Sequence, residues 1–579
     1  MKRFPLTLAP NAMTVLRSRY LAKNADGKVM ETPEQMFRRV ADNVAQAERL
    51  YADDPLASRR AARRFYGLMT SGNFLPNSPT LMNAGRDLQQ LSACFVLPVE
   101  DSLESIFEAV KYQALIHQSG GGTGFSFSHL RPQNDPVLST SGVASGPVSF
   151  MRVFNTATDV VKQGGARRGA NMGILRIDHP DILQFIEVKT NPQELTNFNL
   201  SVGVTDAFMR ALERRQTYPL VHPRTHRTVT RVRAADVFDR LVQSAWKTGE
   251  PGVVFLDTIN AANPTPHIGA MESTNPCGEQ PLLPYEACNL GSINLRRFVG
   301  GARSRQPIDF RRLGEAIHLA VRFLDDVIDM NRYPLADIES MTKGNRKIGL
   351  GLMGFADLLI ELDIPYDSDE ALQLAERLMR YVREEGHAAS ADLAKERGVF
   401  PNFTGSRFES DGHRLRNATV TTIAPTGTIS ILADCSPGIE PLYAVKFVRT
   451  VLDGTQLTSL HPAFVQRLKR AGLYSERMLK AVAATESIQG LDGIPEALRR
   501  VFVTAHDVSP ERHVRMQAAF QKYSDSGVSK TINLPPQATK ADIADALRLA
   551  YRLGCKGITV YRSGSREHQV MACSNTQYC

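Results

Sequence analysis

The sequence lacks the features that place a protein in a membrane or direct it out of the cell. None of its uncharged apolar runs reaches the length of about 18 residues that a membrane-spanning helix needs. The first ten residues include Lys2 and Arg3, but their apolar stretch is short and interrupted by prolines, unlike a signal peptide. These absences favour a cytoplasmic protein with no membrane partner.

Cysteine is scarce as well, and its seven residues are odd in number and scattered over 579 positions. This pattern excludes a disulfide framework. No CxxC pair and no closely spaced Cys/His pair occurs, so no metal-ligand site is expected. Two of the seven, Cys573 and Cys579, lie within the last seven residues, where exposed thiols suggest redox work.

Common nucleotide-binding signatures are also missing. No Walker A motif occurs, and the GxGxxG match from Gly349 to Gly354 follows a polar, basic stretch, whereas a dinucleotide site needs an apolar strand there. We therefore expect these glycines to allow close packing of the following helix. The net charge of +9 is compatible with anionic ligands such as nucleotides. Lys and Arg are spread along the chain without a nucleic-acid-binding motif, so no nucleic acid partner is expected.

Helical and strand-like segments alternate along most of the chain, which predicts an α/β protein. At about 150 residues per domain, the length fits three or four domains or one large α/β barrel with additions. Thr32 and Pro33 predict the start of a helix, as N-cap and first helical residue. We expect three parts: a helical segment over 1–70, a catalytic unit over 71–566 and a loose tail over 567–579.

Cys277 is flanked, two residues away on either side, by an amide, Asn275, and a carboxylate, Glu279. In an extended segment these three side chains would face one space, which would combine a thiol with a hydrogen-bonding amide and a general base. The alternative is a buried cysteine in a turn set by Pro276 and Gly278. Spacing alone does not decide between these interpretations.

The other internal cysteines carry weaker signals. Cys94 lies in a strand-like run, and Cys288 follows Cys277 by eleven residues. Taken alone, each is typical of a small core residue, as are Cys435 and Cys555.

A candidate phosphate-binding turn follows the predicted strand over 419–424. It reads Pro425-Thr426-Gly427-Thr428-Ile429, in which glycine allows a close backbone approach and a following helix would offer unpaired N–H groups. An ordinary strand-to-helix turn, with Thr426 or Thr428 as N-cap, explains the same residues. The Gly-rich stretches over 119–124 and 162–169 offer further backbone N–H groups that could bind an anion.

In combination, these segments resemble the catalytic chains of ribonucleotide reductases, most closely the class II, adenosylcobalamin-dependent enzymes. The resemblance runs from about Leu8 to Glu567. Its motifs occur in family order: Asn77-Ser78-Pro79-Thr80-Leu81, Leu91-Ser92-Ala93-Cys94-Phe95, Asp101-Ser102-Leu103, Asn275-Pro276-Cys277-Gly278-Glu279, Ala287-Cys288-Asn289-Leu290 and Pro425-Thr426-Gly427-Thr428-Ile429. The resemblance implies a ten-stranded α/β barrel of the thiyl-radical type with a helical N-terminal segment.

The resemblance also implies the catalytic roles. Cys277 would form the thiyl radical that abstracts the 3′ hydrogen of the ribose. Glu279 would act as base on the 3′ hydroxyl, and Asn275 would hold the substrate. Cys94 and Cys288 would protonate the leaving 2′ hydroxyl, supply electrons and end as a disulfide.

Two ligand sites are implied as well. Substrate contacts would come from Ser78, Ala93, Cys94, Gly122, Asn275, Pro276, Cys277, Gly278, Glu279, Pro425, Thr426, Gly427, Thr428 and Ile429. A deoxynucleoside triphosphate effector, with Mg²⁺, would contact Asp101, Ser102, Leu103 and Arg131. The loops over 163–170 and 189–199 would relay the identity of the effector to the active site, and a homodimer beside the effector site is expected.

One strand bears on the subclass. Chains that receive their radical from a second subunit carry tandem tyrosines, whereas Val560 precedes the single Tyr561 here and no Tyr-Tyr pair occurs. This favours a radical generated in place with adenosylcobalamin; a class I chain that needs a radical-generating subunit is the alternative. Cys573 and Cys579 are spaced more widely than the family's tail pair, but they are the candidate shuttle that thioredoxin or glutaredoxin would re-reduce. No ATP-binding regulatory domain is recognisable before the first barrel motif.

Overall fold

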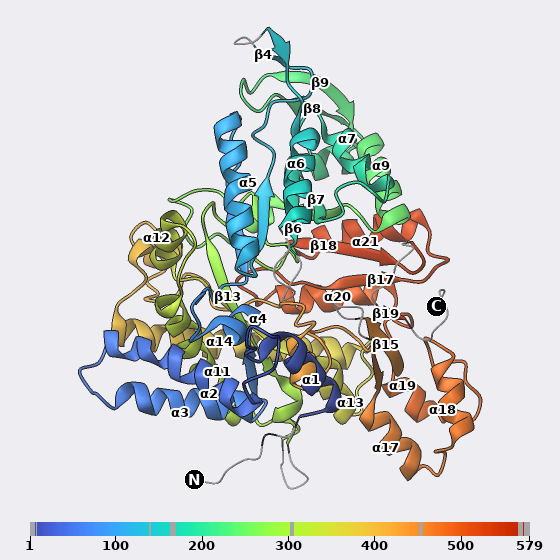
Figure 1. The fold of residues 1–579 in the computed structure, drawn as a ribbon. Coiled ribbons are helices and arrows are strands. Elements are labelled where there is room, and N and C mark those ends of the chain that lie inside the picture. The colour runs from blue at the N-terminus through green and yellow to red at the C-terminus, as the bar shows by residue number, and fades with distance from the viewer. Residues whose placement is uncertain are drawn as a thin grey trace.

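The computed structural model describes residues 6, 8–137, 141–161, 169–300, 306–450, 456–565 and 571–572. Its N-terminal part is helical (Figure 1). The predicted start at Thr32 and Pro33 is confirmed: the Thr32 side chain accepts from the Gln35 amide, and the Gln35 side chain accepts from the Thr32 amide. The elements are α1 (Pro10–Val15), η1 (Leu16–Tyr20), α2 (Pro33–Val44), η2 (Ala45–Leu50) and α3 (Ala57–Thr70).

Five parallel strands form one half of the central sheet. In spatial order they are β2 (Cys94–Leu97), β3 (Gly122–Ser126), β6 (Asn171–Arg176), β7 (Phe198–Val204) and β10 (Gly252–Phe255). The helices of this half are α5 (Leu103–Gln118), α6 (Pro147–Val160), α7 (Ile182–Glu187), η3 (Val188–Thr190), α8 (Asp206–Glu213), α9 (Ala234–Thr248) and α10 (Leu256–Ala261). The short helix α4 (Ser78–Asn83), which precedes β2, packs on the N-terminal elements η1 and α2. Two small hairpins project from it, β4 (Pro136–Val137) with β5 (Gly142–Val143), and β8 (Thr217–Val221) with β9 (Thr228–Arg233).

The second half is also parallel. It contains β13 (Ala287–Asn294), β14 (Ile348–Met353), the segment 420–423, the segment that leads into β17 (Thr531–Leu534), and β18 (Gly557–Arg562). Single parallel bridges, Leu350 to Thr421 and Ile423 to Val528, place 420–423 in the sheet. Its helices are η4 (Leu295–Phe298), α11 (Phe310–Met330), α12 (Ala336–Asn345), α13 (Phe355–Glu361), α14 (Asp369–Arg397), η5 (Pro401–Phe403), α15 (Arg407–Ser410), α16 (Ile429–Leu432), α20 (Pro510–Gln521) and α21 (Lys540–Arg552).

Two antiparallel seams close these halves into a ring. Cys288 of β13 lies opposite Cys94 of β2, and Val253 of β10 lies opposite Ile558 of β18. Ten segments of the described chain therefore form a closed α/β barrel, which confirms the predicted fold class. The short strand β1 (Phe74–Pro76) pairs with the far end of β13.

A hairpin occupies the interior of this barrel. It is formed by β11 (Ser273–Thr274) and β12 (Pro281–Leu282), and Cys277 lies at its tip. Glycine in the wall makes room for it: a Cβ atom on Gly124 would lie 1.8 Å from the Thr274 carbonyl oxygen, and one on Gly527 would lie 2.7 Å from the Gly278 carbonyl oxygen. Because Gly124 and Gly527 belong to opposite halves, both halves enclose the hairpin.

The GxGxxG segment has a different role from the one expected. Its first two glycines belong to strand β14 and face the barrel interior: a Cβ atom on Gly349 would meet Leu290, and one on Gly351 would lie 2.6 Å from the Thr422 carbonyl oxygen. The third, Gly354, is the N-cap of α13. The prediction that Gly349 and Gly351 serve packing of the following helix was wrong.

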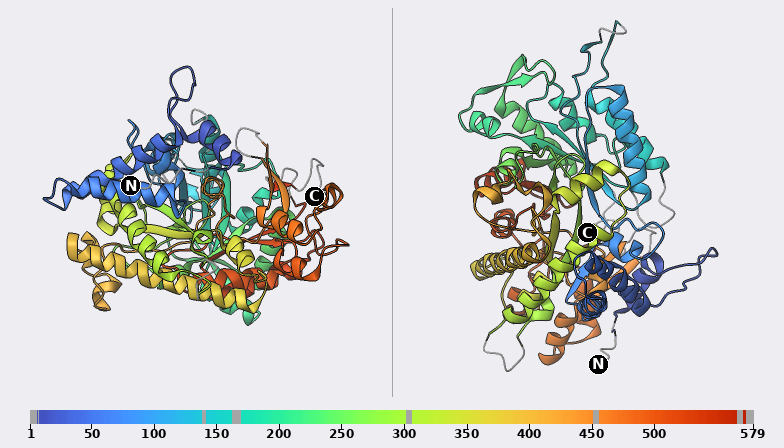
Figure 2. Two further views of the ribbon diagram at one scale, coloured as in Figure 1. Left: turned by 90° about the horizontal axis from the view of Figure 1, so that it is seen from below. Right: turned by 90° about the vertical axis from the view of Figure 1, so that its left-hand side faces the viewer.

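Outside the ring, two large apolar cores pack the helices against the strands, one for each half. A buried ion-pair cluster joins the N-terminal helices to the second half, since Glu48 of η2 contacts Arg397 of α14, which also pairs with Asp325 of α11. A smaller unit follows residue 441, with β15 (Lys446–Thr450), β16 (Gln456–Leu460), α17 (Pro462–Arg470), α18 (Glu476–Ala483), α19 (Glu496–Val501) and β19 (Met571–Ala572). The left view of Figure 2 shows this unit and the N-terminal helices on opposite sides of the molecule.

Candidate active site

Cys277 is presented by a tight turn. The Gly278 amide donates to the Asn275 carbonyl over 3.0 Å, and Gly278 has a positive φ of 81°, which glycine adopts without strain. The predicted extended arrangement of residues 275–279 was therefore wrong, because Pro276 and Gly278 reverse the chain. The turn alternative predicted a buried cysteine, but the Cys277 side chain is exposed in a cavity.

The two neighbours of Cys277 are held inside the barrel. Asn275 donates through Nδ2 to the Cys94 sulfur over 3.2 Å, and its Oδ1 accepts from the Gln280 amide over 2.9 Å. Glu279 is buried, and its carbonyl accepts from the Gly527 amide over 2.8 Å. The hairpin tip is thus fixed to both halves of the barrel, which restricts where the Cys277 sulfur can lie.

Cys94 and Cys288 face each other across the β2–β13 seam. Opposed residues of antiparallel strands have Cα atoms about 4.5–5.5 Å apart, a separation that a disulfide can span. Both side chains point inward, into a cluster that includes Val96 and Leu290, and both are thiols rather than halves of a disulfide. The structure therefore brings together two cysteines that lie far apart in the sequence.

A buried ion pair lies beside Cys288. The β13–β14 register, with Asn289 opposite Ile348, places Lys347 next to Cys288. The Lys347 ammonium binds the Glu286 carboxylate over 2.6 Å, with both side chains at most 2% exposed. Burial raises the pKa of the Cys288 thiol far above its ordinary value; the charge of Lys347 opposes this shift and that of Glu286 adds to it.

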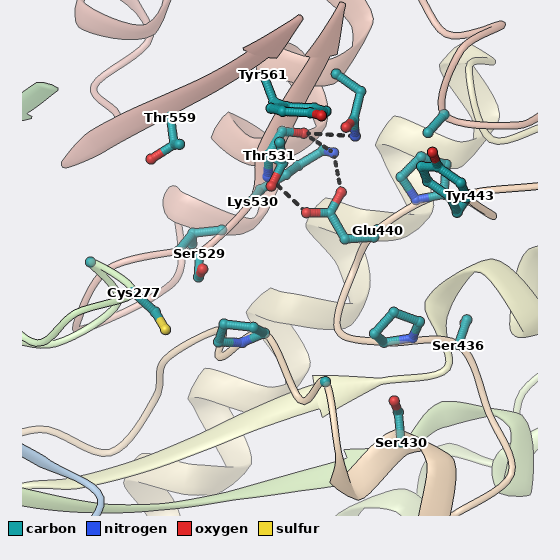
Figure 3. A pocket seen from close by; sticks show the side chains of 18 of the residues that line it. Cys277, Ser430, Ser436, Glu440, Tyr443, Ser529, Lys530, Thr531, Thr559 and Tyr561 are labelled. Atoms are coloured by element: carbon teal, nitrogen blue, oxygen red, sulfur yellow. Dashed lines mark hydrogen bonds and ion pairs between the residues drawn. The ribbon is translucent and has the colours of Figure 1, made fainter. Parts of the chain in front are cut away.

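The cavity at Cys277 has a volume of about 930 Å³. Figure 3 shows Cys277 on one side of it and Glu440, Lys530 and Thr531 on the other. Pro425, Gly427 and Ser430 line it as well, together with hydroxyl-bearing residues from β17 and β18.

The predicted phosphate-binding turn borders this cavity. Thr426 has a positive φ of 52°, and its hydroxyl accepts from the Gly438 amide over 2.7 Å. Thr428 occupies the N-cap position of the four-residue helix α16, from Ile429 to Leu432, but makes no side-chain cap. The strand-to-helix alternative therefore placed the N-cap correctly at Thr428, although the Thr428 hydroxyl makes no capping hydrogen bond, and Gly427 is the exposed point of the turn.

Three further predicted substrate contacts lie on the barrel wall or near it. The Ala93 amide donates to the Cys288 carbonyl, and the Gly122 amide donates to the Ala93 carbonyl. A Cβ atom on Gly122 would lie 2.9 Å from Pro276, so this glycine admits the hairpin tip. Ser78 begins α4, where its hydroxyl lies 2.7 Å from the Tyr20 hydroxyl.

The predicted effector residues form a separate group at the start of α5. The Arg131 guanidinium pairs with Asp101 over 2.8 Å, and Ser102 caps α5 through the Ser105 amide. Leu103 is 65% exposed. Residues 163–168 of the first relay loop lie outside the described residues, but the second loop reaches the active site: Asn199 donates through Nδ2 to the Pro276 carbonyl over 2.7 Å.

The tail cysteines Cys573 and Cys579 lie outside the described residues. Within the described residues, no cluster of His, Cys, Asp or Glu has the arrangement of a metal site, and no helix is long and apolar enough to cross a bilayer. Two ion pairs near the site were not predicted from the sequence: Lys347–Glu286, which is buried, and Lys530–Glu440, in which only the lysine is fully buried. Only their closeness to predicted motifs could have drawn attention to them.

Comparison with known proteins agrees with this architecture. A family described as "Ribonucleotide reductase, barrel domain" matches residues 92–414 and 408–561, and "Ribonucleotide reductase, all-alpha domain" matches residues 6–89. The chain therefore belongs to the ribonucleotide reductase family.

Individual relatives are similar to this chain over nearly its whole length. The chain is 50% identical to the vitamin B12-dependent ribonucleoside-diphosphate reductase of Thermoplasma acidophilum, over 99% of this chain and 81% of the relative. It is also 50% identical to the protein of that name from Mycobacterium tuberculosis, over 98% and 81%. The solved class Id ribonucleotide reductase alpha subunit of Actinobacillus ureae has the same fold, with a TM-score of 0.79 and 24% identity over 97% of this chain and 98% of that one.

Proposed function

We propose that this chain is a vitamin B12-dependent reductase that converts ribonucleoside diphosphates to 2′-deoxyribonucleotides through a thiyl radical on Cys277. The observation that carries the proposal is the placement of Cys277 at the hairpin tip, exposed in a large cavity, with the cross-strand pair Cys94 and Cys288 behind it. The names of the relatives at 50% identity support both the cofactor and the diphosphate substrate.

Five residues of the chain take separate roles in the proposed reaction. Cys277, once its thiol hydrogen has been removed, takes the 3′ hydrogen of the ribose and returns it to C3′ after the 2′ position has been reduced. Glu279 accepts the proton of the 3′ hydroxyl and gives it back at the end, and Asn275, held against Cys94, orients the sugar. Cys94 and Cys288 together give two electrons and two protons; the 2′ hydroxyl leaves as water and a disulfide bond forms between the sulfurs.

The cavity offers more room than a nucleotide substrate needs, and part of an adenosylcobalamin cofactor would enter it beside the substrate. Its volume of about 930 Å³ lies at the upper end of the range for small-molecule sites, and it reaches from Cys277 to the wall at Glu440 and Tyr443. When bound, the cofactor supplies the oxidising equivalent that takes the Cys277 hydrogen. The strand β18 carries Val560 before Tyr561, without the tandem tyrosines of chains that need a second subunit, which makes the class I alternative less supported.

We extend the proposal to regulation and turnover. The turn from Pro425 to Ile429 would bind the substrate phosphates through backbone N–H groups. A deoxynucleoside triphosphate with Mg²⁺ would bind near Asp101 and Arg131, and the loop that ends at Asn199 would carry its effect to the hairpin.

Two partners complete the cycle. A second copy of the chain would cover α5, on which Leu103 and Phe107 are more than half exposed in the single chain. Thioredoxin or glutaredoxin, in the cytoplasm, would re-reduce the active-site disulfide through Cys573 and Cys579.

The test is an assay of the purified chain with adenosylcobalamin, a ribonucleoside diphosphate and dithiothreitol. We expect deoxyribonucleotide to form without another protein. Activity only after addition of a separate radical-generating subunit would contradict the cobalamin assignment and favour the class I alternative.

A further inference from the structure

The wall of the cavity opposite Cys277 contains a buried charged group that the chemistry above does not use. Glu440 follows the turn after α16, and Lys530 and Thr531 lie at the start of β17 (Figure 3). The Lys530 ammonium binds the Glu440 carboxylate over 2.7 Å, and the Thr531 amide donates to the other carboxylate oxygen over 2.7 Å.

Lys530 has no capacity left to bind a ligand. Its side chain is fully buried, and its three N–H groups meet three acceptors: Glu440, the Thr531 carbonyl at 3.1 Å and Nδ1 of His513 at 3.0 Å. His513 can accept there because its Nε2 donates to the Ala505 carbonyl over 3.0 Å and because burial lowers its pKa and keeps the ring neutral. Lys530 therefore fixes Glu440 and neutralises its charge.

Glu440, in contrast, faces the cavity. Its side chain is 24% exposed, and each of its two oxygens, with about two acceptor positions, has one protein donor. Acceptor positions therefore remain toward the cavity. A carboxylate accepts from N–H and O–H groups and repels phosphate, so this wall does not suit the charged end of a nucleotide.

We propose that Glu440 is a binding residue for the cobalamin cofactor and accepts hydrogen bonds from its carboxamide N–H or hydroxyl groups. This inference rests on the proposed function. The periphery of cobalamin carries several primary carboxamides, neutral donors of the kind that a neutralised carboxylate binds. The proposed phosphate turn at Gly427 lines the same cavity, but the Glu440 carboxylate would repel a phosphate, so its own acceptor positions suit the neutral donors of the cofactor.

The experiment measures binding of hydroxocobalamin to the full chain by equilibrium dialysis, without nucleotide and without turnover. Glu440→Gln keeps the size of the side chain but replaces one acceptor by a donor, and we expect the Kd to rise about tenfold or more, as for loss of a hydrogen bond to a charged group. Glu440→Asp, which keeps the charge for Lys530 but withdraws it from the cavity, should also weaken binding. Glu511→Gln, at an exposed glutamate of α20, is the matched control and should bind as the wild type does.

Two outcomes separate this inference from the function on which it rests. If the wild type binds hydroxocobalamin and both Glu440 variants, folded by their melting temperature, bind it within twofold of the wild type, the inference is overturned and the proposed function stands. If the wild type does not bind it, both fall. The Kd for a ribonucleoside diphosphate should not change in the Glu440 variants; selective weakening of nucleotide binding would instead assign Glu440 to the substrate.

Discussion

Lys347 and Glu286 allow a test of how the barrel controls the reducing cysteines. Lys347→Met removes a buried positive charge, and Glu286→Gln removes its negative partner, 2.6 Å away. Breaking a buried pair costs about 3–5 kcal/mol. Glu286 would keep its contacts with the Asn345 side chain at 2.5 Å and the Leu283 amide at 2.6 Å, so we expect about 3 kcal/mol for Lys347→Met. Both variants should therefore be less stable.

The Cys288 thiol should respond in opposite directions. The Lys347 charge lowers its pKa and the Glu286 charge raises it, against a background of burial that raises it strongly. Lys347→Met should therefore raise the pKa further, and Glu286→Gln should lower it. Each unit changes the thiolate fraction tenfold, and because nucleophilicity compensates in part, the rate of disulfide formation should change about threefold per unit.

The assay follows formation of the Cys94–Cys288 disulfide in the reduced chain with a small disulfide oxidant, by acid quench and mass spectrometry. Lys347→Met should slow it and Glu286→Gln should accelerate it. Lys343→Met, at an exposed lysine four residues earlier that pairs with Glu339, is the control and should leave the rate unchanged. Rates that fall in both variants would show that the pair acts only through the stability of the fold, and would refute the electrostatic reasoning.

The remaining predictions concern the cysteines. Cys277→Ser should abolish deoxyribonucleotide formation, and product formed at the wild-type rate would refute its role. Cys94→Ser should retain radical formation, measured by electron paramagnetic resonance, but block normal product; loss of the radical signal would contradict this. Replacing Cys573 and Cys579 by serine should spare turnover with dithiothreitol and stop it with thioredoxin, whereas equal loss with both reductants would exclude a shuttle. Burial raises the pKa of Cys555 to about 12, above the ordinary value near 9, so its contribution to stability is present below pH 9 and is lost as the pH rises from 9 to 12. In Cys555→Ala, the unfolding free energy measured by denaturant titration should decline less steeply in that range, by about 1.4 kcal/mol per pH unit; an unchanged slope would contradict the assignment.

The alternation of strands and helices was enough to predict the α/β class, because each parallel strand needs a helical return. The closed ring was not derivable in this way. Its seams depend on the β2–β13 and β10–β18 registers, and residues 420–423 join the sheet through single bridges. Only the family resemblance predicted ten strands.

The candidate site, too, could be predicted from the sequence only in part. Motifs identified Cys277 and its neighbours, but the two-residue periodicity failed there because Pro276 and Gly278 form a turn. Cys94 and Cys288 were paired by resemblance, since nothing local to either residue indicates which strand lies opposite. Lys347 escaped notice because a lysine before an apolar strand normally marks a solvated edge, whereas the interior of this barrel encloses it with Glu286.

A single turnover tests the central claim most directly. The chain, with Cys573 and Cys579 replaced and all thiols reduced, is mixed with adenosylcobalamin and a ribonucleoside diphosphate without external reductant. We expect one deoxyribonucleotide for each active chain and an equal amount of the Cys94–Cys288 disulfide, measured by peptide mapping. Product formed while Cys94 and Cys288 both remain thiols would contradict it.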